Sequence, residues 1–328
     1  MVPNSGGFFA INRELLERVY ELGMNPACAL LVLASGSGRD NKRTSWSCNA
    51  VRKYTSIGRQ RAKNAVNQLV EEGVLEKESG RDIRNPRYTI KLDSEDEMIW
   101  LPVTFITGAG LETPPLERLR QTGDVQIIRL LLDVYAFCSI AEEAGLPWDV
   151  VSGKSERKRI GESGEFTIWG FNFAEQQVCF LTHDLVRPHV LPENDCSDFW
   201  RRLKTLIDLG LLQRSLVMFD SKDGAVLFEL EDVFTGERLV ERAAETCLQM
   251  LPEEYTYTLE EQEVVVPLLS HICAPVARQL YVPTYRQHTE LTKAGYAASR
   301  ERIESFRRCL GNIDGKYARL EPAISRVV

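Results

Sequence analysis

Six polar side chains lie close together in the sequence and carry the donors and acceptors that nucleic-acid recognition needs. They are Arg59, Gln60, Arg61, Lys63, Asn64 and Asn67. Guanidinium and amide groups match the hydrogen-bonding edges of purine bases in the major groove, and Lys and Arg also neutralise phosphate. These residue types at this spacing predict contact with duplex DNA.

A helix over residues 58–72 is expected to present these side chains. Apolar residues recur there at helical spacing, so they form one stripe that faces a core. They are Ala62, Ala65, Val66, Leu69 and Val70. The six polar residues lie on the other face, in the half of the helix that enters the groove in helix-turn-helix docking.

The residues before this helix predict a helix-turn-helix. Ser47 suits the N-cap of a short helix over residues 48–54. Residues 55–58 supply the turn, in which Gly58 is expected to adopt the backbone of a tight corner and Ile57 to fill the space between the helices.

The residues after the helix predict a β-wing. Gly73 stands where a helix C-cap glycine belongs, and residues 74–77 and 87–90 have the composition of two strands. The wing is expected to contribute three more DNA contacts, from Arg81, Arg84 and Arg87.

Charge supports a polyanionic partner for this module. Residues 39–91 hold 13 Lys and Arg against six Asp and Glu, whereas the whole chain has a net charge of −7, so the remainder carries −14. A basic segment inside an acidic chain is typical of a module that meets nucleic acid. The flanking basic residues that we expect to join the interface are Lys42, Arg43, Arg52 and Lys53.

The module resembles the winged helix-turn-helix of bacterial regulators of the GntR and MarR type. The matching residues are Ile57-Gly58-Arg59-Gln60-Arg61-Ala62, Ala65-Val66 and Leu69-Val70-Glu71-Glu72-Gly73-Val74-Leu75. In that family a turn leads into a recognition helix with polar residues at its start, and the helix leaves through a glycine into the wing. The family's usual serine at the start of that helix is Gly58 here. The resemblance implies a DNA-binding transcriptional regulator.

A later segment repeats this pattern, which predicts a second winged helix and an internal duplication. Residues 197–208 carry an apolar stripe and leave through Gly210 into two strand-like runs, residues 214–219 and 225–230. A helix over residues 124–144, with Asp124 as its N-cap, would be the first helix of this copy.

The second copy is expected to be a poor DNA reader. Its candidate recognition helix carries Arg201, Arg202 and Lys204, but Asp195 and Asp198 at its start would repel phosphate. We therefore expect this copy to pack or dimerise instead.

The remaining segments complete a mainly helical interpretation. Residues 152–164 are interpreted as a solvated loop rather than a second phosphate contact, and residues 166–173 alternate like a strand. Residues 236–251 and 259–273 are predicted to be helices. Residues 299–310 form a helix whose apolar face either dimerises or caps the preceding domain.

The expected fold is mainly α with small β-wings, in tandem winged-helix domains followed by a helical C-terminal region. The domains are a DNA-binding winged helix over residues 1–92, a linker over 93–123, a degenerate winged helix over 124–232 and a helical region over 233–328. A homo-oligomer is expected, and the C-terminal region could also bind a protein partner.

Motifs for catalysis, metals and membranes are missing from the sequence. The eight cysteines form no CxxC pair, and the four histidines show no ligand spacing relative to them. The GxSxG, HExxH and kinase signatures are absent, and no run of 18 apolar residues exists. We therefore expect a cytoplasmic protein that is not an enzyme and needs no metal or cofactor.

The function expected from the sequence is sequence-specific binding of double-stranded DNA by a bacterial or mobile-element transcriptional regulator. Two alternatives stay open. Plasmid or phage replication initiators also use two winged helices in tandem, and some winged helices are adaptors that bind protein. A regulator should prefer an inverted repeat, because a two-fold dimer imposes its symmetry on the site, whereas an initiator should prefer direct repeats.

Overall fold

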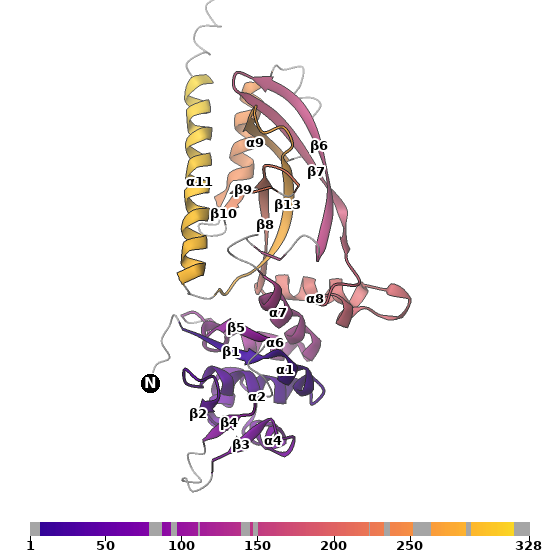
Figure 1. The fold of residues 1–328 in the computed structure, drawn as a ribbon, viewed down its shortest axis with the longest axis vertical. Helices are drawn as coiled ribbons and strands as arrows, with labels where there is room; N and C mark the ends of the chain where they lie inside the picture. The colour runs from indigo at the N-terminus through magenta and orange to yellow at the C-terminus, as the bar shows by residue number, and fades with distance from the viewer. Residues whose placement is uncertain are drawn as a thin grey trace, which may run out of the picture. The chain divides into compact units, whose positions relative to one another are not determined.

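A computed structural model describes most of the chain, which forms two compact units. The described residues are 7–78, 87–92, 97–110, 112–138, 145–146, 150–222, 224–232, 237–251, 264–286 and 290–317. Unit 1 comprises residues 1–138, 184–213 and 283–292, and unit 2 comprises residues 139–183, 214–282 and 293–328. The chain therefore passes between the units several times (Figure 1).

Unit 1 is mostly helical, and its most buried helix is α2. In chain order its helices are α1 (Arg13–Tyr20), α2 (Met24–Ser35), α3 (Cys48–Thr55), α4 (Arg59–Glu71), α5 (Thr104–Thr107), α6 (Pro115–Thr122), α7 (Val125–Phe137), the 3-10 turns η1 (Arg187–His189) and η2 (Pro192–Asn194), and α8 (Ser197–Asp208). Residues 26–34 of α2 are all buried, because this helix is apolar nearly all round. It packs against α1, α3, α4 and α6.

The strands of unit 1 form two small sheets. β1 (Phe8–Asn12) pairs antiparallel with β5 (Met98–Pro102). β2 (Arg43–Thr44), β4 (Tyr88–Ile90) and β3 (Leu75–Lys77) form an antiparallel sheet in the order β2-β4-β3. The predicted helix-turn-helix and the base of the wing are thus confirmed as elements, while the wing tip, residues 79–86, lies outside the described residues.

The corner between α3 and α4 differs from the prediction in one respect. The left-handed residue is Ser56, with φ 53°, whereas Gly58 has φ −59° and ψ 148° and is the N-cap of α4. Gly58 is therefore not required by the backbone of the turn. Ile57 is 4% exposed and fills the space between the helices as expected. Gly73, with φ 70°, ends α4 as predicted.

Gly36, which follows α2, packs so closely against an aromatic ring that a side chain at this position would overlap the ring. A Cβ there would overlap the indole of Trp46 and lie 2.8 Å from its Cβ, and this indole stacks on Tyr54 with ring centroids 5.1 Å apart. Gly36→Ala is expected to lower the free energy of unfolding by about 2 kcal/mol, because the ring must move. Gly38→Ala is the control, since its Cβ would make an ordinary 3.5 Å contact. Chemical unfolding followed by circular dichroism measures both, and equal losses would contradict the argument.

Residues 93–123, expected to be a linker, are part of unit 1 where the structure describes them. They contain β5, α5 and α6, and α6 contributes Leu116 and Leu119 to the buried interior. The linker prediction rested on the acidic run at residues 93–97, which does not show that the apolar strand after it will pair with the distant β1.

A distant segment closes unit 1 through Tyr285. The Tyr285 hydroxyl accepts a 2.7 Å hydrogen bond from Arg118 of α6 and donates one of 2.8 Å to Glu112. The Tyr135 hydroxyl of α7 donates to the carbonyl oxygen of Tyr285. Residues 283–292 are therefore part of the same fold as residues 1–138.

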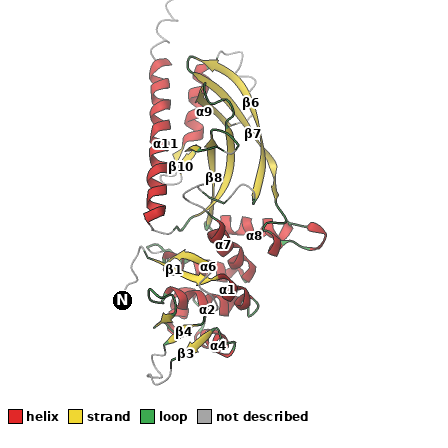
Figure 2. Cartoon of the chain, in the orientation of Figure 1, coloured by secondary structure: helices red, strands yellow, loops and turns green. Residues whose placement is uncertain are grey.

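Unit 2 is built around two three-stranded sheets, and this overturns the mainly helical fold class. Its elements are β6 (Val151–Ser163), β7 (Phe166–Cys179), β8 (Leu212–Phe219), β9 (Val226–Glu229), β10 (Glu231–Asp232), β11 (Glu237–Arg238), α9 (Leu239–Met250), β12 (Val264–Leu269), β13 (Val276–Pro283) and α11 (Glu290–Tyr317). The larger sheets have the orders β12-β7-β6 and β13-β8-β9. Figure 2 shows the strands of this unit in yellow.

Two segments of unit 2 have a different structure from the one predicted. Of residues 152–164, expected to be a loop, residues 152–163 belong to β6, which pairs with β7, and only Gly164 lies in the turn between the strands. Residues 259–273, expected to be a helix, contain the strand β12, which is at the edge of its sheet and so tolerates Pro267. The predicted strand over 166–173 is confirmed by β7. The predicted helix over 236–251 is confirmed from residue 239 to 250 by α9, whereas residues 237–238 form the strand β11 and residue 236 lies outside the described residues.

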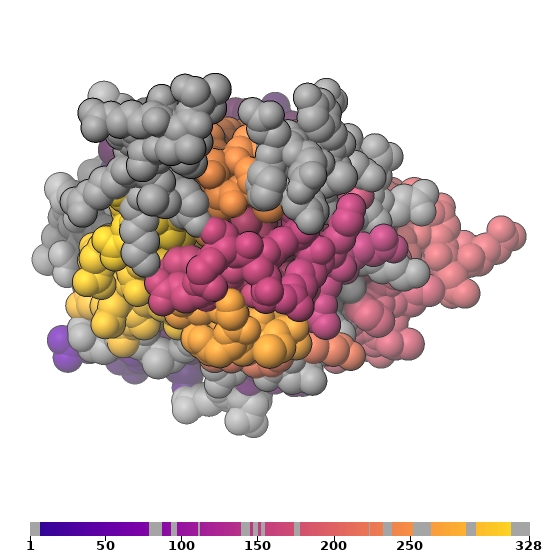
Figure 3. Space-filling view, turned by 90° about the horizontal axis from the view of Figure 1, so that it is seen from above, coloured from indigo at the N-terminus to yellow at the C-terminus, as the bar shows by residue number. Residues whose placement is uncertain are grey.

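The long helix α11 covers the core of unit 2. Ile303, Phe306 and Leu310 are buried in this core together with Phe171 of β7, and the rings of Phe228 and Phe306 stack with centroids 3.8 Å apart. Figure 3 shows α11 in yellow beside the magenta β6–β7 hairpin. The apolar stripe of residues 299–310 therefore caps its own unit and is not available for a dimer interface.

The elements assigned to a second winged helix belong to different units, so the duplication is not present. α7 and α8 pack against each other in unit 1, whereas β8 from Arg214 onward and β9 belong to a sheet of unit 2. The β6–β7 hairpin, with strands of 13 and 14 residues, separates the two helices in sequence. The repeated pattern reflected only the common sequence of an amphipathic helix, a glycine and a strand.

Candidate nucleic-acid interface

One face of α4 presents all six polar side chains predicted for DNA contact. Ala62, Ala65, Val66 and Leu69 are buried against the core. The six polar residues are exposed: Arg59, Gln60, Arg61, Lys63, Asn64 and Asn67. The helical repeat has therefore separated them from the core as predicted.

The polar residues of α4 are ordered across that face. Gln60, Asn64 and Asn67 recur at i, i+4 and i+7, on the side of the helix opposite the buried stripe. By the same helical geometry, Arg59 and Lys63 lie on one flank of this amide row, and Arg61 lies on the other. The centre of the face is neutral and its two flanks are cationic.

The cations of α4 have no acidic partners in the part of the chain that the structure describes. Within those residues, no carboxylate comes within ion-pair distance of Arg59, Arg61 or Lys63. The first turn of α4 also contains no acidic residue, and its N-cap, Gly58, offers no side-chain hydrogen bond. The N-terminal half of the helix therefore presents positive charge and unsatisfied backbone N–H groups.

The basic residues of α8 are neutralised in contrast. Arg201 contacts Asp124 and Asp198 at 3.2 and 3.1 Å. Arg202 reaches the same two carboxylates at 3.1 and 2.9 Å, and Lys204 pairs with an aspartate one turn later at 2.6 Å. These ion pairs leave α8 little net charge to offer a polyanion.

The cluster of Arg202 and its two carboxylates also lies beside the buried His189. Arg202 donates a 3.2 Å hydrogen bond to Nδ1 of His189, which is 1% exposed. Burial, followed by the charge of Arg202, lowers the pKa of His189 to about 4. This ring is therefore neutral near pH 7, and the cluster serves the packing of η1 against α8.

A hollow of about 440 Å³ lies where α3 meets α4. It is lined by Asn49, Arg52, Lys53, Ser56, Ile57 and Gly58. Arg52 and Lys53 are exposed, and the Lys53 ammonium lies 4.8 Å from the centre of the Tyr54 ring. The structure thus brings two predicted basic residues beside the N-terminus of α4, where backbone N–H groups favour an anion.

Sequence reasoning did not select Asn49 and Ser56, which line the same hollow. A usable signal existed, because Asn49, Arg52, Lys53 and Ser56 recur at i, i+3, i+4 and i+7 along α3 and its cap. That spacing places polar residues on one face of the short helix.

The other predicted contacts are less closely grouped. Arg87 is exposed at the base of the wing, while Arg81 and Arg84 lie outside the described residues. Lys42 and Arg43 lie at β2, which β4 separates from β3, the strand that follows α4. Neither residue lines the hollow between α3 and α4.

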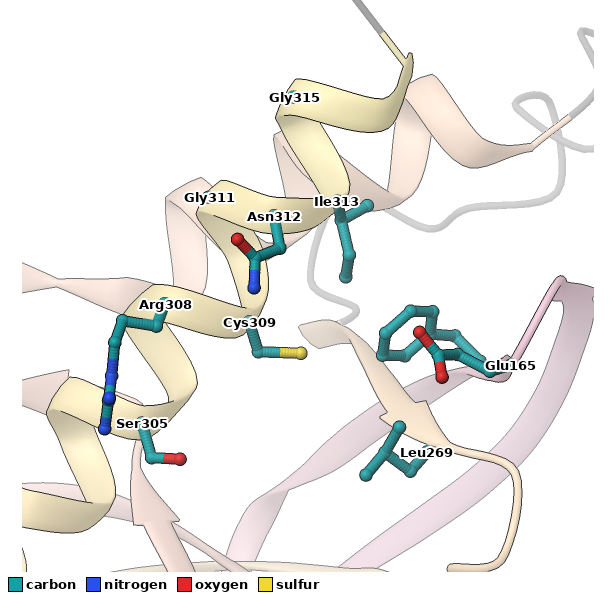
Figure 4. A pocket seen from close by; sticks show the side chains of 10 residues that line it. Glu165, Leu269, Ser305, Arg308, Cys309, Gly311, Asn312, Ile313 and Gly315 are labelled. Atoms are coloured by element: carbon teal, nitrogen blue, oxygen red, sulfur yellow. The ribbon is translucent and has the colours of Figure 1, made fainter.

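A larger hollow, of about 1070 Å³, occurs in unit 2 between α11 and the β6–β7 turn (Figure 4). Phe166, Leu269 and Ile313 give it an apolar lining, and Glu165 and Arg308 add opposite charges. None of the residues predicted to bind DNA lines it.

The comparisons with known proteins leave the chain unassigned. No family model, curated protein or solved structure matches it. Among the residues that the structure describes, no cluster of His, Cys, Asp and Glu could hold a metal ion, and no helix is long and apolar enough to cross a membrane.

Proposed function

We propose that this chain binds double-stranded DNA through unit 1, with α4 in the major groove. The observation that carries the proposal is the contrast between two amphipathic helices of that unit. The described surroundings of α4 contain no carboxylate partner for its three cations, whereas carboxylates neutralise the cations of α8. Unpaired cations on both flanks of a helix that follows a helix-turn-helix corner are suited to contact with the phosphates of a duplex.

The corner between α3 and α4 would hold the DNA backbone. Arg52 and Lys53 border the hollow beside Gly58, and the first-turn N–H groups of α4 are available there for a phosphate oxygen. Such contacts fix the position of a recognition helix without reading sequence. Arg87 at the wing base would supply a further backbone contact.

The biological role that we propose is transcriptional regulation, and an inverted repeat in the selected sequence would indicate that the chain acts as a homodimer. The replication-initiator alternative rested on a second winged helix, and the fold removes that basis. The three unpaired cations on the flanks of α4 favour a polyanion over the protein partner of an adaptor.

The test is selection of bound duplexes from a random library at roughly physiological salt. The wild-type chain is expected to enrich one sequence, and the Arg59→Ala, Arg61→Ala variant to retain little DNA. The matched control is Arg201→Ala, Lys204→Ala, which removes the same charge from α8 and should select the same sequence as wild type.

Three outcomes decide the matter. An enriched sequence that depends on α4 and not on α8 supports the proposal, and an inverted repeat in it supports a two-fold dimer. Absence of any enrichment by the wild-type chain refutes specific DNA binding. Equal loss in both variants would show that general charge, rather than α4, holds the DNA.

A further inference from the structure

Two amides at the centre of the exposed face of α4 are joined to each other. Gln60 Nε2 donates a 2.8 Å hydrogen bond to Oδ1 of Asn64, one turn further along the helix. Both side chains are exposed. The bond limits the rotation of two side chains that would otherwise be mobile at a helix surface.

The bond also determines which groups remain for a ligand. It uses the acceptor of Asn64 and one N–H of Gln60. The carbonyl oxygen of Gln60 remains as an acceptor, and the second N–H of Gln60 and the amide nitrogen of Asn64 remain as donors. An acceptor beside a donor is the complement of adenine in the major groove, where N6 donates and N7 accepts.

The cations of α4 lie at the edges of the exposed face and not at its centre. Arg59 and Lys63 lie on one side of the amide row and Arg61 on the other, so a helix that points its amides at the groove floor turns these cations toward the two backbones. The chemistry of the face is thus divided between neutral base reading and charged phosphate binding.

We propose that the Gln60–Asn64 pair reads an adenine, as a single preformed unit, while Arg59, Arg61 and Lys63 bind phosphates. This inference rests on the proposed function, because it assigns the specificity of the same helix. It predicts that the selected sequence contains an A·T base pair whose identity depends on the amides and not on the arginines.

Isosteric variants test the assignment. Gln60→Glu replaces the amide donor of the pair by an acceptor. Asn64→Asp removes the N–H groups of Asn64 but keeps an oxygen that can accept from Gln60. Binding is measured to the selected duplex and to duplexes with each base pair replaced in turn. Wild type is expected to prefer adenine roughly 5- to 150-fold at one position. Both variants should lose this preference, and Gln60→Glu should favour cytosine, whose N4 donates.

Two controls separate this inference from the proposed function. Arg61→Ala should weaken binding to every duplex by the same factor and leave the adenine preference intact. The single variants Gln60→Ala and Asn64→Ala each break the pair. The double variant Gln60→Ala, Asn64→Ala should therefore lose no more of the adenine preference than the single alanine variant that loses more.

The inference is overturned if wild type selects a sequence but both isosteric variants keep every base preference. It is also overturned if Arg61→Ala changes a base preference, or if the two amides contribute additively. In these cases DNA binding by α4 stands. A wild-type chain that selects no sequence overturns the inference and the proposed function together.

Discussion

The Arg59→Ala, Arg61→Ala, Lys63→Ala variant is expected to bind the selected duplex roughly 1000-fold more weakly than wild type. Each charge-assisted hydrogen bond that the variant cannot form removes about 1.5 kcal/mol of binding free energy. The logarithm of affinity should also fall less steeply with the logarithm of salt concentration, by about 0.9 for each phosphate that is no longer neutralised. Titrations at several salt concentrations measure both quantities.

The salt dependence identifies how these residues act. Each single variant should reduce the slope by a similar amount, while Lys204→Ala should leave it unchanged because that lysine is paired with an aspartate. A triple variant with weaker binding but an unaltered slope would contradict phosphate binding by the flanks of α4 and point to an indirect effect on folding.

Removal of Arg13 is expected to lower the free energy of unfolding of unit 1 by about 3–5 kcal/mol at pH 8. Arg13 forms a 3.0 Å ion pair with Asp133 of α7, whose side chain is 3% exposed. Arg13→Ala leaves that carboxylate buried without its partner, which is the costly way to break such a pair. Urea unfolding at a series of pH values measures the effect.

Acidification should restore much of the free energy of unfolding that Arg13→Ala loses at pH 8. Burial raises the pKa of Asp133 to about 6 even though Arg13 lowers it, so the pKa of the variant lies higher still. A carboxyl whose pKa is raised by folding binds its proton more readily in the folded state. Its contribution to stability is therefore present below the unfolded pKa near 3.8 and is lost as pH rises through the folded pKa.

The control is the double variant Arg13→Ala, Asp133→Asn, which lacks both charges. The double variant should be more stable at pH 8 than Arg13→Ala alone. On acidification it should gain less stability than Arg13→Ala gains. A single variant that is equally destabilised at pH 8 and pH 5 would show that Arg13 acts through packing and not through the buried charge.

Local sequence patterns were sufficient for the elements that present the candidate site. α4 could be predicted because its apolar stripe, exposed face and C-terminal glycine all lie within one short segment. The N-cap of α7 could be predicted for the same reason, since the Asp124 side chain accepts from the nearby Gln126 N–H.

Contacts between distant segments were not accessible in the same way. β6 contains mostly polar residues, and its strand conformation depends on pairing with the aromatic strand β7. β12 is a short apolar run that periodicity alone cannot assign to a helix or a strand.

Ion pairs between residues far apart in the sequence could not be predicted either. The bonds from Arg202 to Asp198 connect neighbours on one helix and could be anticipated, but its bond to Asp124 joins residues far apart in sequence. The sequence showed acidic residues at the start of α8, but only the fold shows that Asp124 also neutralises its cations. The left-handed backbone at Ser56, in place of Gly58, is a further detail that composition did not reveal.

The closing contact between Tyr135 and Tyr285 has a consequence for how the protein is made. A ribosome has to release the chain beyond residue 285 before the segment that completes unit 1 can dock. The helices that carry the basic face are therefore synthesised long before their fold can be finished. A nascent chain stalled at residue 138 would contain the sequence of α4 but would still lack α8 and the Tyr285 segment.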